Sequence, residues 1–363
     1  MHSDMRSLRV WILPPILTAV RPRNRRPPLR GTRTRLHLAS SPRGYATGAE
    51  NALHPSQSVE EETLPHYDPD EFYPVHISEV FNGKYQVVGK LGYGANSTVW
   101  LGRDITTDRM SNYVTLKICT KTPTESIDRE ILAYRHLGSL RSSHPGLPHV
   151  RGLIDSFEVV RSDGSHHHCF VHQPLHLTMW DMQRFGGTST TFPQGMVKSA
   201  LRYLLQALDF LHTEANITHC DIKLSNIMLT IEDEGVLTDF EDAERQHPCP
   251  RKICLCDFGE ARIGGSYSYE EIQPEVYKAP EIIMQTDWSH RADIWNVACV
   301  AWDLMEKKHL FDARDDEGFH NNRYHVAEMV AYMGIPPMEF QRRSPNTALV
   351  FDEEGELTNS TGC

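Results

Sequence analysis

Residues 219–226 read HCDIKLSN, and residues 257–259 read DFG. Together these stretches bring two carboxylates, an ammonium group and an amide to fixed positions in the chain. Phosphoryl transfer asks for little covalent help from a protein, because it depends on in-line positioning and on cations that offset the charge of the phosphate oxygens. The two stretches therefore predict a site for phosphoryl transfer.

Each polar residue of these stretches has an expected role. We expect Asp221 to accept or orient the proton of the attacking hydroxyl and Lys223 to neutralise the transferring phosphate. Asn226 and Asp257 are the predicted magnesium ligands. An ordinary polar loop is the alternative, but a long amphipathic helical pattern runs into this loop and the apolar residues 227–229 follow it.

A second segment competes for the metal-binding aspartate, because residues 238–244 read TDFEDAE and residues 256–262 read CDFGEAR. We expect the later segment to hold the metal. Apolar residues 253–256 form the strand that should precede it, and Gly259 permits the backbone turn that points Asp257 at the metal.

A glycine-containing segment lies between two predicted strands at residues 85–91 and 98–101. Glycine lets backbone amides approach phosphate oxygens without an intervening side chain. A tight hairpin would use the same glycines, and Ser97 stands where a third glycine is expected, so this pattern alone is a weak signal. The predicted nucleotide-binding residues here are Leu91, Gly92, Tyr93, Gly94, Ala95, Asn96, Ser97, Thr98 and Val99.

Lys117 supports that prediction from a third predicted strand at residues 113–118. We expect its ammonium group to bind the α and β phosphates of a nucleotide. Glu130, on a helical pattern at residues 125–137, is the predicted partner that holds Lys117 in place. Glu125 is a weaker candidate for the partner, and a surface lysine at a strand end is the alternative for Lys117.

The composition is that of a soluble globular protein, with 363 residues of which 39% are hydrophobic. No stretch approaches the roughly 20 uninterrupted apolar residues of a membrane helix, so we expect no membrane span. Eight cysteines are scattered along the chain, which indicates reduced thiols and not a disulfide framework.

Two possible metal sites are discounted. Cys249, Cys254 and Cys256 with His247 lack a second close pair of ligands, and two of these cysteines alternate along a predicted strand. Residues 166–168, three histidines, follow a predicted hairpin turn at Asp163-Gly164, so we expect them to be solvated.

Charge divides the chain into two unlike parts. Residues 1–48 contain ten arginines and one acidic residue, and their charge of +9 leaves −20 for the rest of a chain whose net charge is −11. The acidic body disfavours nucleic acid as a direct partner and favours basic polypeptides, with solubility alone as the alternative. Residues 1–48 have the composition of an organelle transit peptide, although proline pairs interrupt the helix that a mitochondrial presequence needs. A disordered basic arm or a misassigned start are the alternatives, and residues 49–84 are predicted to be a linker.

Helical patterns dominate the second half of the chain. Residues 197–211 carry a broad apolar stripe, and residues 294–305 are apolar nearly all round, as in a central buried helix. Asp293 is expected to tie down the backbone of the 219–226 loop, with a dipole partner of the helix as its alternative role. Residues 278–281 read KAPE, which fits the end of an activation segment, with residues 267–276 as the platform for a substrate peptide.

With these motifs in order, the chain resembles a eukaryotic protein kinase. Residues 91–101 (LGYGANSTVWL), 255–262 (LCDFGEAR) and 292–295 (ADIW), together with the HCDIK loop, resemble the serine/arginine-rich-protein-specific kinases, particularly those of fungi. The resemblance extends from about residue 62 to residue 345.

The resemblance implies an α+β fold with two lobes, a β-rich lobe at residues 85–172 and a helical lobe at residues 173–345, followed by a polar tail at residues 346–363. It implies ATP and Mg²⁺ as cofactors and serine in Arg/Ser-rich proteins as the phosphate acceptor. It also implies a monomer that regulates messenger-RNA splicing in cytoplasm and nucleus. The arginine-rich N-terminus leaves a mitochondrial location as the alternative.

Several residues depart from the pattern of this family. Cys220 replaces the arginine that docks an activation-loop phosphate, so activity is not expected to need that phosphorylation. His172 stands where a bulky residue guards the adenine pocket, and Asn321-Asn322 dilute the acidic groove expected for basic substrates. The last helices of the large lobe are expected to be missing after residues 324–333, which would leave Glu281 without a buried arginine partner.

Two other functions remain as rivals. A truncated pseudokinase would keep these residues and act only as a nucleotide-binding or protein-binding module. A kinase-like phosphotransferase for small molecules is disfavoured by the KAPE segment.

Overall fold

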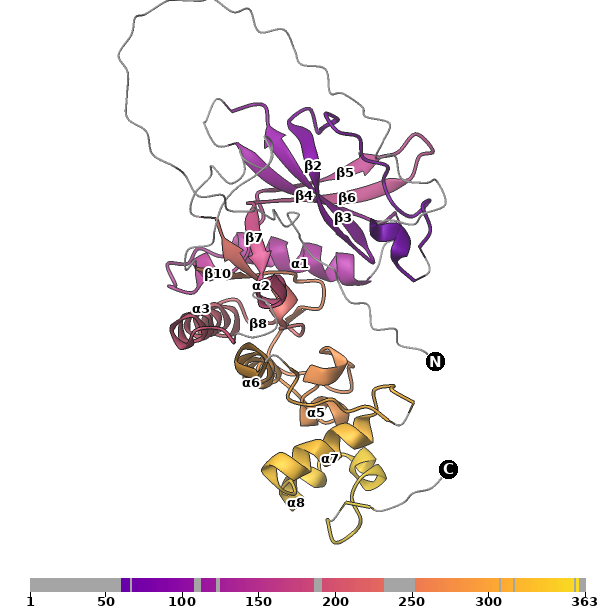
Figure 1. Ribbon diagram of the computed structural model, residues 1–363, viewed down its shortest axis with the longest axis vertical. Coiled ribbons are helices and arrows are strands. Elements are labelled where there is room, and N and C mark those ends of the chain that lie inside the picture. The colour runs from indigo at the N-terminus through magenta and orange to yellow at the C-terminus, as the bar shows by residue number, and fades with distance from the viewer. Residues whose placement is uncertain are drawn as a thin grey trace, which may run out of the picture.

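An antiparallel sheet of six strands, in the order β1-β2-β3-β4-β6-β5, forms the upper part of the molecule in Figure 1. The computed structural model describes residues 60–358 apart from residues 66, 108–111, 122–124, 186–190, 232–251, 307, 316 and 356. The strands of the sheet are β1 (Val80–Phe81), β2 (Tyr85–Gly94), β3 (Ser97–Asp104), β4 (Tyr113–Cys119), β5 (Asp155–Val160) and β6 (His166–His172).

Alternation along the strands gives this sheet two different faces. Val114, Leu116 and Ile118 of β4 are buried in a core that belongs to the sheet itself. Side chains on the opposite face point the other way, and here Cys119 and Phe170 join a larger core that includes helix α1 (Glu125–Ser139). The sheet therefore buries one face alone and presents the other to the rest of the protein.

The predicted hairpin is present, but its histidines are not all solvated. Gly164 has a φ of 85° in the turn between β5 and β6, as the Asp163-Gly164 pattern predicts. His166 is exposed, whereas His167 is buried and its Nδ1–H donates to the Cys119 carbonyl at 2.9 Å. The expectation of solvated histidines was wrong for His167, because neighbouring side chains of a strand point to opposite faces.

The lower part of the molecule is mainly helical (Figure 1). Its helices are α2 (Met179–Phe185), α3 (Gln194–Thr213), α5 (Pro280–Ile283), α6 (Arg291–Glu306), α7 (Asn322–Met333) and α8 (Met338–Gln341). Short 3-10 helices are η2 (Glu60–Thr63), η3 (Leu147–His149), η4 (Leu224–Asn226), η5 (Glu275–Tyr277) and η6 (Pro345–Leu349). One small sheet contains strands β7 (Leu175–Thr178), β9 (Ile227–Thr230) and β10 (Ile253–Leu255). Another contains strands β8 (Ile217–Thr218) and β11 (Arg262–Ile263).

One apolar core runs from α1 through α3 to α6. Leu204, Leu208 and Leu211 of α3 are buried in it together with Val300 of α6, as the predicted stripe of residues 197–211 requires. This core holds both ends of the 219–226 loop, because Ile217 before the loop and Ile227 after it belong to the core, as does Ile222 within the loop. No helix among the residues that the structure describes has the length and hydropathy to cross a membrane.

Helix α6 is not buried all round. Asp293, Val300 and Leu304 are buried, but Ile294 and Met305 keep 47% and 49% of their surface exposed. The prediction of a fully buried helix was therefore wrong for this side of α6. Apolar residues on every side of a helix allow burial, but the helix packs only where another element covers it.

The start of helix α7 explains one departure from the family pattern, Asn321. The side-chain oxygen of Asn321 accepts hydrogen bonds from the backbone N–H groups of Arg323 and Tyr324. Asparagine is among the preferred residues at a helix N-cap. Asn321 therefore starts α7, which the sequence interpretation, concerned with acidic charge, did not anticipate.

His325 of α7 predicts sensitivity to acid. It is fully buried, and its Nε2 has no hydrogen-bond partner among the residues that the structure describes. Burial, with smaller effects of His320 and Lys278, lowers its pKa from 6.5 to about 3. As the pH falls below 6.5, the unfolded state binds this proton before the folded state does, so the contribution of His325 to the free energy of unfolding decreases. The decrease ends near pH 3, where the folded state binds the proton as well. We expect urea denaturation of the wild type to lose about 2 kcal/mol more between pH 7 and pH 5 than that of His325→Leu. Equal losses in the two proteins would contradict this assignment.

Candidate active site

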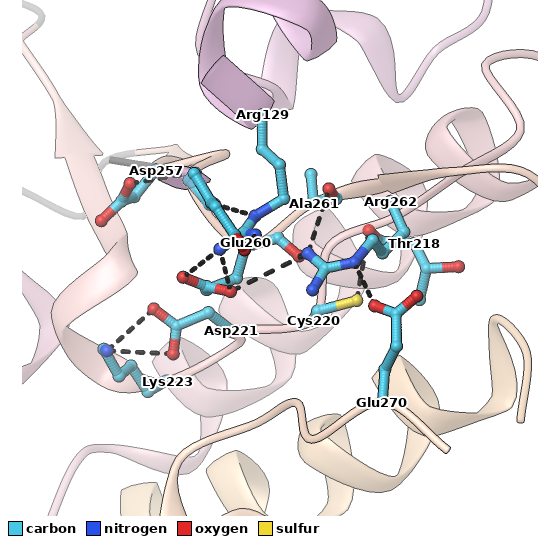
Figure 2. Close-up of polar contacts among 12 residues, drawn as sticks. Arg129, Thr218, Cys220, Asp221, Lys223, Asp257, Glu260, Ala261, Arg262 and Glu270 are labelled. Carbon is cyan, nitrogen blue, oxygen red and sulfur yellow. Dashed lines mark hydrogen bonds and ion pairs between the residues drawn. The ribbon is translucent and has the colours of Figure 1, made fainter. Parts of the chain in front are cut away.

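The 219–226 loop brings its polar residues together (Figure 2). Lys223 Nζ lies 2.9 and 2.8 Å from the two carboxylate oxygens of Asp221. Asn226 Nδ2 donates to the Asp221 carbonyl and to its Oδ2, both at 2.8 Å. One carboxylate is thus oriented by a cation and an amide, and the predicted cluster of Asp221, Lys223 and Asn226 is formed.

Asp293, which is fully buried, anchors the backbone of this loop. Its Oδ2 accepts from the His219 N–H at 2.8 Å and its Oδ1 from the Cys220 N–H at 3.0 Å. Cys220 has a φ of 66°, a left-handed conformation that costs energy for a residue with a Cβ. The two hydrogen bonds hold that conformation, which confirms the predicted tie between Asp293 and the loop.

The turn after β10 presents Asp257, and its geometry corrects one detail of the prediction. Asp257 itself is the left-handed residue, with a φ of 68°. Gly259 supplies space instead, since a Cβ there would lie 2.4 Å from Ser126 Oγ of α1. A larger residue would have to displace the Ser126 hydroxyl, because helix α1 approaches the turn closely, a contact that no local pattern reveals. Residues 238–244, the competing segment, lie outside the described residues.

The predicted pair of Lys117 and Glu130 is formed between β4 and α1. Lys117 Nζ lies 2.7 Å from Glu130 Oε2 and 3.7 Å from Asp257 Oδ1. Burial alone would lower the pKa of Lys117, but the two carboxylates outweigh it and raise that pKa. Burial likewise opposes ionisation of Asp257, yet Lys117 and Lys223 hold the pKa of its carboxyl below the ordinary value. Both groups therefore carry their charges at neutral pH.

A cleft lies where Lys117, Glu130 and Asp257 meet. Of the nine predicted residues 91–99, Tyr93, Gly94, Ser97 and Val99 line the cleft. Leu91, Gly92, Ala95, Asn96 and Thr98 are not among its lining residues.

The sequence interpretation missed part of this lining. Tyr134, Arg151, Ser225 and Cys256 line the cleft without having been predicted, alongside His172, Lys117, Glu130, Asn226 and Asp257. Arg151 is buried in an irregular stretch that gives no sequence signal. Tyr134 was visible only as one apolar position of a helical stripe, and it reaches the cleft because α1 packs beneath the sheet.

The residues present fit a nucleotide with a divalent cation. Asn226 and Asp257 line the same cleft and offer amide and carboxylate oxygens, which hard divalent cations prefer. Lys117 adds a positive charge that suits phosphate oxygens. No group of three His, Cys, Asp or Glu residues suited to a metal occurs within the described part of the chain; Cys249 and His247 lie outside it.

Polar contacts hold the segment before α5. Lys278 pairs with Glu271, and the Tyr277 carbonyl accepts from Asn296 Nδ2 of α6 at 2.7 Å. Burial raises the pKa of Glu281, and Arg291 lowers it only partly. Among the residues that the structure describes, no ion pair of Glu281 with arginine is found within 4.0 Å.

Comparison with known proteins agrees with this geometry. A model of the protein kinase domain matches residues 85–353. A serine/threonine protein kinase of Aspergillus fumigatus is 36% identical over 342 residues, which cover 87% of this chain and 81% of that protein. Serine/threonine-protein kinase SRPK of Physarum polycephalum is 26% identical over 82% of this chain and 78% of its own length. SRSF protein kinase 3 of Homo sapiens is 36% identical over 49% of this chain and 31% of its own length.

These similarities confirm the predicted resemblance and the two-lobed α+β kinase fold. The domain match covers most of the chain, and its limits include the loop, the turn and the Lys117–Glu130 pair described above. The chain belongs to the protein kinase family, and it is a serine/threonine protein kinase that uses ATP and a divalent metal.

Proposed function

We propose that this kinase transfers the γ-phosphate of magnesium-bound ATP to serines in Arg/Ser-rich proteins. The observation that carries this proposal is the similarity to kinases named SRPK and SRSF protein kinase 3. The charge of the chain supports it, because the chain beyond residue 48 carries a net charge of −20. Carboxylates pair with guanidinium groups in a bidentate geometry, so an acidic surface favours arginine-rich peptides.

The site suggests a division of work among its residues. Asp221 would accept the proton of the substrate serine, and the Lys223 ammonium group beside it would neutralise charge on the transferring phosphate. Lys117, held by Glu130, would bind the phosphates of ATP. Asn226 and Asp257 would hold the cation, which offsets negative charge on the phosphate oxygens.

A peptide assay tests the substrate class. We expect the purified protein to phosphorylate an Arg/Ser-repeat peptide with a kcat/KM at least about tenfold above that for a proline-directed serine peptide, since each charged contact to arginine contributes on the order of 1 kcal/mol or more. The matched control is the same repeat with every arginine replaced by alanine. Equal rates on the three peptides would remove the Arg/Ser specificity and leave the kinase activity intact.

A further inference from the structure

Four charged side chains connect helix α1 to the segment that follows the Asp257 turn, and we call Arg129, Glu260, Arg262 and Glu270 the α1 clip (Figure 2). Arg129 Nη2 lies 2.9 and 3.1 Å from the two carboxylate oxygens of Glu260. Arg262 Nε lies 2.6 Å from Glu270 Oε2, and its Nη1 donates to the Glu260 carbonyl at 2.8 Å. Glu260 therefore lies between two guanidinium groups, one from α1 and one from β11.

The clip is joined directly to the phosphate-binding groups. Arg129 precedes Glu130 in α1, and Arg129 Nε donates to the Gly259 carbonyl at 2.9 Å. The same turn of helix thus contacts Gly259 and Glu260 through Arg129 and contacts Lys117 through Glu130. Lys117 in turn lies 3.7 Å from Asp257, two residues before Gly259. A displacement of α1 would break both sets of contacts together.

The geometry sets these pairs apart from ordinary surface ion pairs. Exposed pairs contribute little to stability, whereas networks of several charges are an exception. Arg129 and Arg262 side chains are 22% and 16% exposed, and Glu260 is 39% exposed. The side chains of the clip are therefore buried enough to orient α1. They are also exposed enough that substituting them would leave no cavity in a hydrophobic core.

We propose that Glu260 is a positioning residue that holds α1 on the Asp257 turn through Arg129. Arg262, oriented by Glu270, fixes Glu260 from the other side. The function of the clip is to keep Glu130, Lys117 and Asp257 in the aligned state, so its loss reduces the fraction of molecules that are aligned for phosphoryl transfer.

Kinetics of Glu260→Gln and Arg129→Met test this role. Both variants keep the size of the side chain and remove the charged contact. We expect kcat on a serine peptide to fall about tenfold in each, because charge-assisted contacts of this kind are worth about one decade in an equilibrium. The KM for ATP and the calorimetric Kd for magnesium-ATP should stay within about threefold, because the nucleotide-binding residues themselves are unchanged.

The double variant and the controls separate positioning from general structural damage. Arg129→Met with Glu260→Gln should lose no more kcat than either single variant, since both remove one interaction. The charge-exchanged pair, Arg129→Glu with Glu260→Arg, should recover part of the lost kcat. Glu125→Gln is the matched control, because Glu125 also contacts Arg129 at 3.1 Å but its side chain is 92% exposed. It should leave kcat unchanged.

Three results would overturn the proposal. The first is kcat within twofold of wild type in both single variants. The second is a double variant whose loss is the product of the two single losses. The third is a fall in kcat matched by an equal fall in the folded fraction measured by thermal unfolding. None of these results bears on the Arg/Ser specificity, which the peptide comparison tests separately.

Discussion

Asp221→Asn is expected to lower kcat by about 10² to 10⁴ while leaving magnesium-ATP binding within a few-fold of wild type. A positioned proton acceptor contributes roughly that much to a rate. Asparagine keeps the shape of the side chain and one oxygen for the hydrogen bond from Asn226, which the structure places at 2.8 Å. It removes the charge that pairs with Lys223 and the group that would take the proton. Steady-state kinetics with a serine peptide and calorimetry with magnesium-ATP measure the two effects independently.

The matched control for Asp221 is Glu339→Gln. Glu339 lies on α8, away from the cleft. Its side chain is 87% exposed and pairs with Arg343. Its kcat should equal that of the wild type. If Asp221→Asn kept wild-type kcat, Asp221 would have no part in proton transfer and the rival function, a binding module without turnover, would gain support.

Asp257→Asn is expected to abolish the thermal stabilisation that magnesium-ATP confers. A ligand at 100 times its Kd stabilises a folded protein by about 2.7 kcal/mol, and this stabilisation should vanish when the carboxylate that Lys117 and Lys223 keep ionised is removed. Asparagine is preferable to alanine, because it tolerates the left-handed φ of 68° better than other residues with a Cβ. Differential scanning calorimetry with and without magnesium-ATP measures the shift.

The two variants are informative as a pair. Asp221→Asn should bind the nucleotide without turning it over, whereas Asp257→Asn should do neither. In the absence of ligand, both proteins should unfold with midpoints close to that of the wild type, since the anchor of the loop, Asp293, is unchanged. Full retention of the magnesium-ATP shift in Asp257→Asn would exclude Asp257 as a metal ligand and leave Asn226 alone in that role.

Much of the site could be predicted because its signals are local. The HCDIKLSN loop carries its own polar groups within eight positions, and the structure brings Asp221, Lys223 and Asn226 into mutual contact. The Lys117–Glu130 pair could be predicted because a strand and the helix after it are short, regular elements whose inward positions repeat with a fixed period. The apolar run of residues 253–256 likewise predicted a strand before the DFG turn, and the structure shows it as β10.

The predictions were wrong where the environment of a residue depends on which other elements pack against it. His167 is buried because it shares its face of β6 with Cys169 and Val171 of the sheet's own core, although three histidines after a turn are typical of a solvated loop. Gly259 leaves room for the Ser126 hydroxyl and does not have a left-handed backbone conformation. Ile294 and Met305 are apolar and exposed, since helical periodicity states which residues share a face but not whether that face is covered.

By itself, the sequence determined the kinase motifs, their order and the chemistry of each polar residue, because covalent neighbours and helical or strand periods are properties of the chain alone. Only the tertiary structure decided how α1 lies against the Asp257 turn, which brings Arg129 to Glu260 across more than a hundred residues. It also decided which residues complete the cleft, such as Arg151 and Tyr134. Contacts of this kind depend on packing between distant elements, and no spacing within the sequence encodes the distance between them.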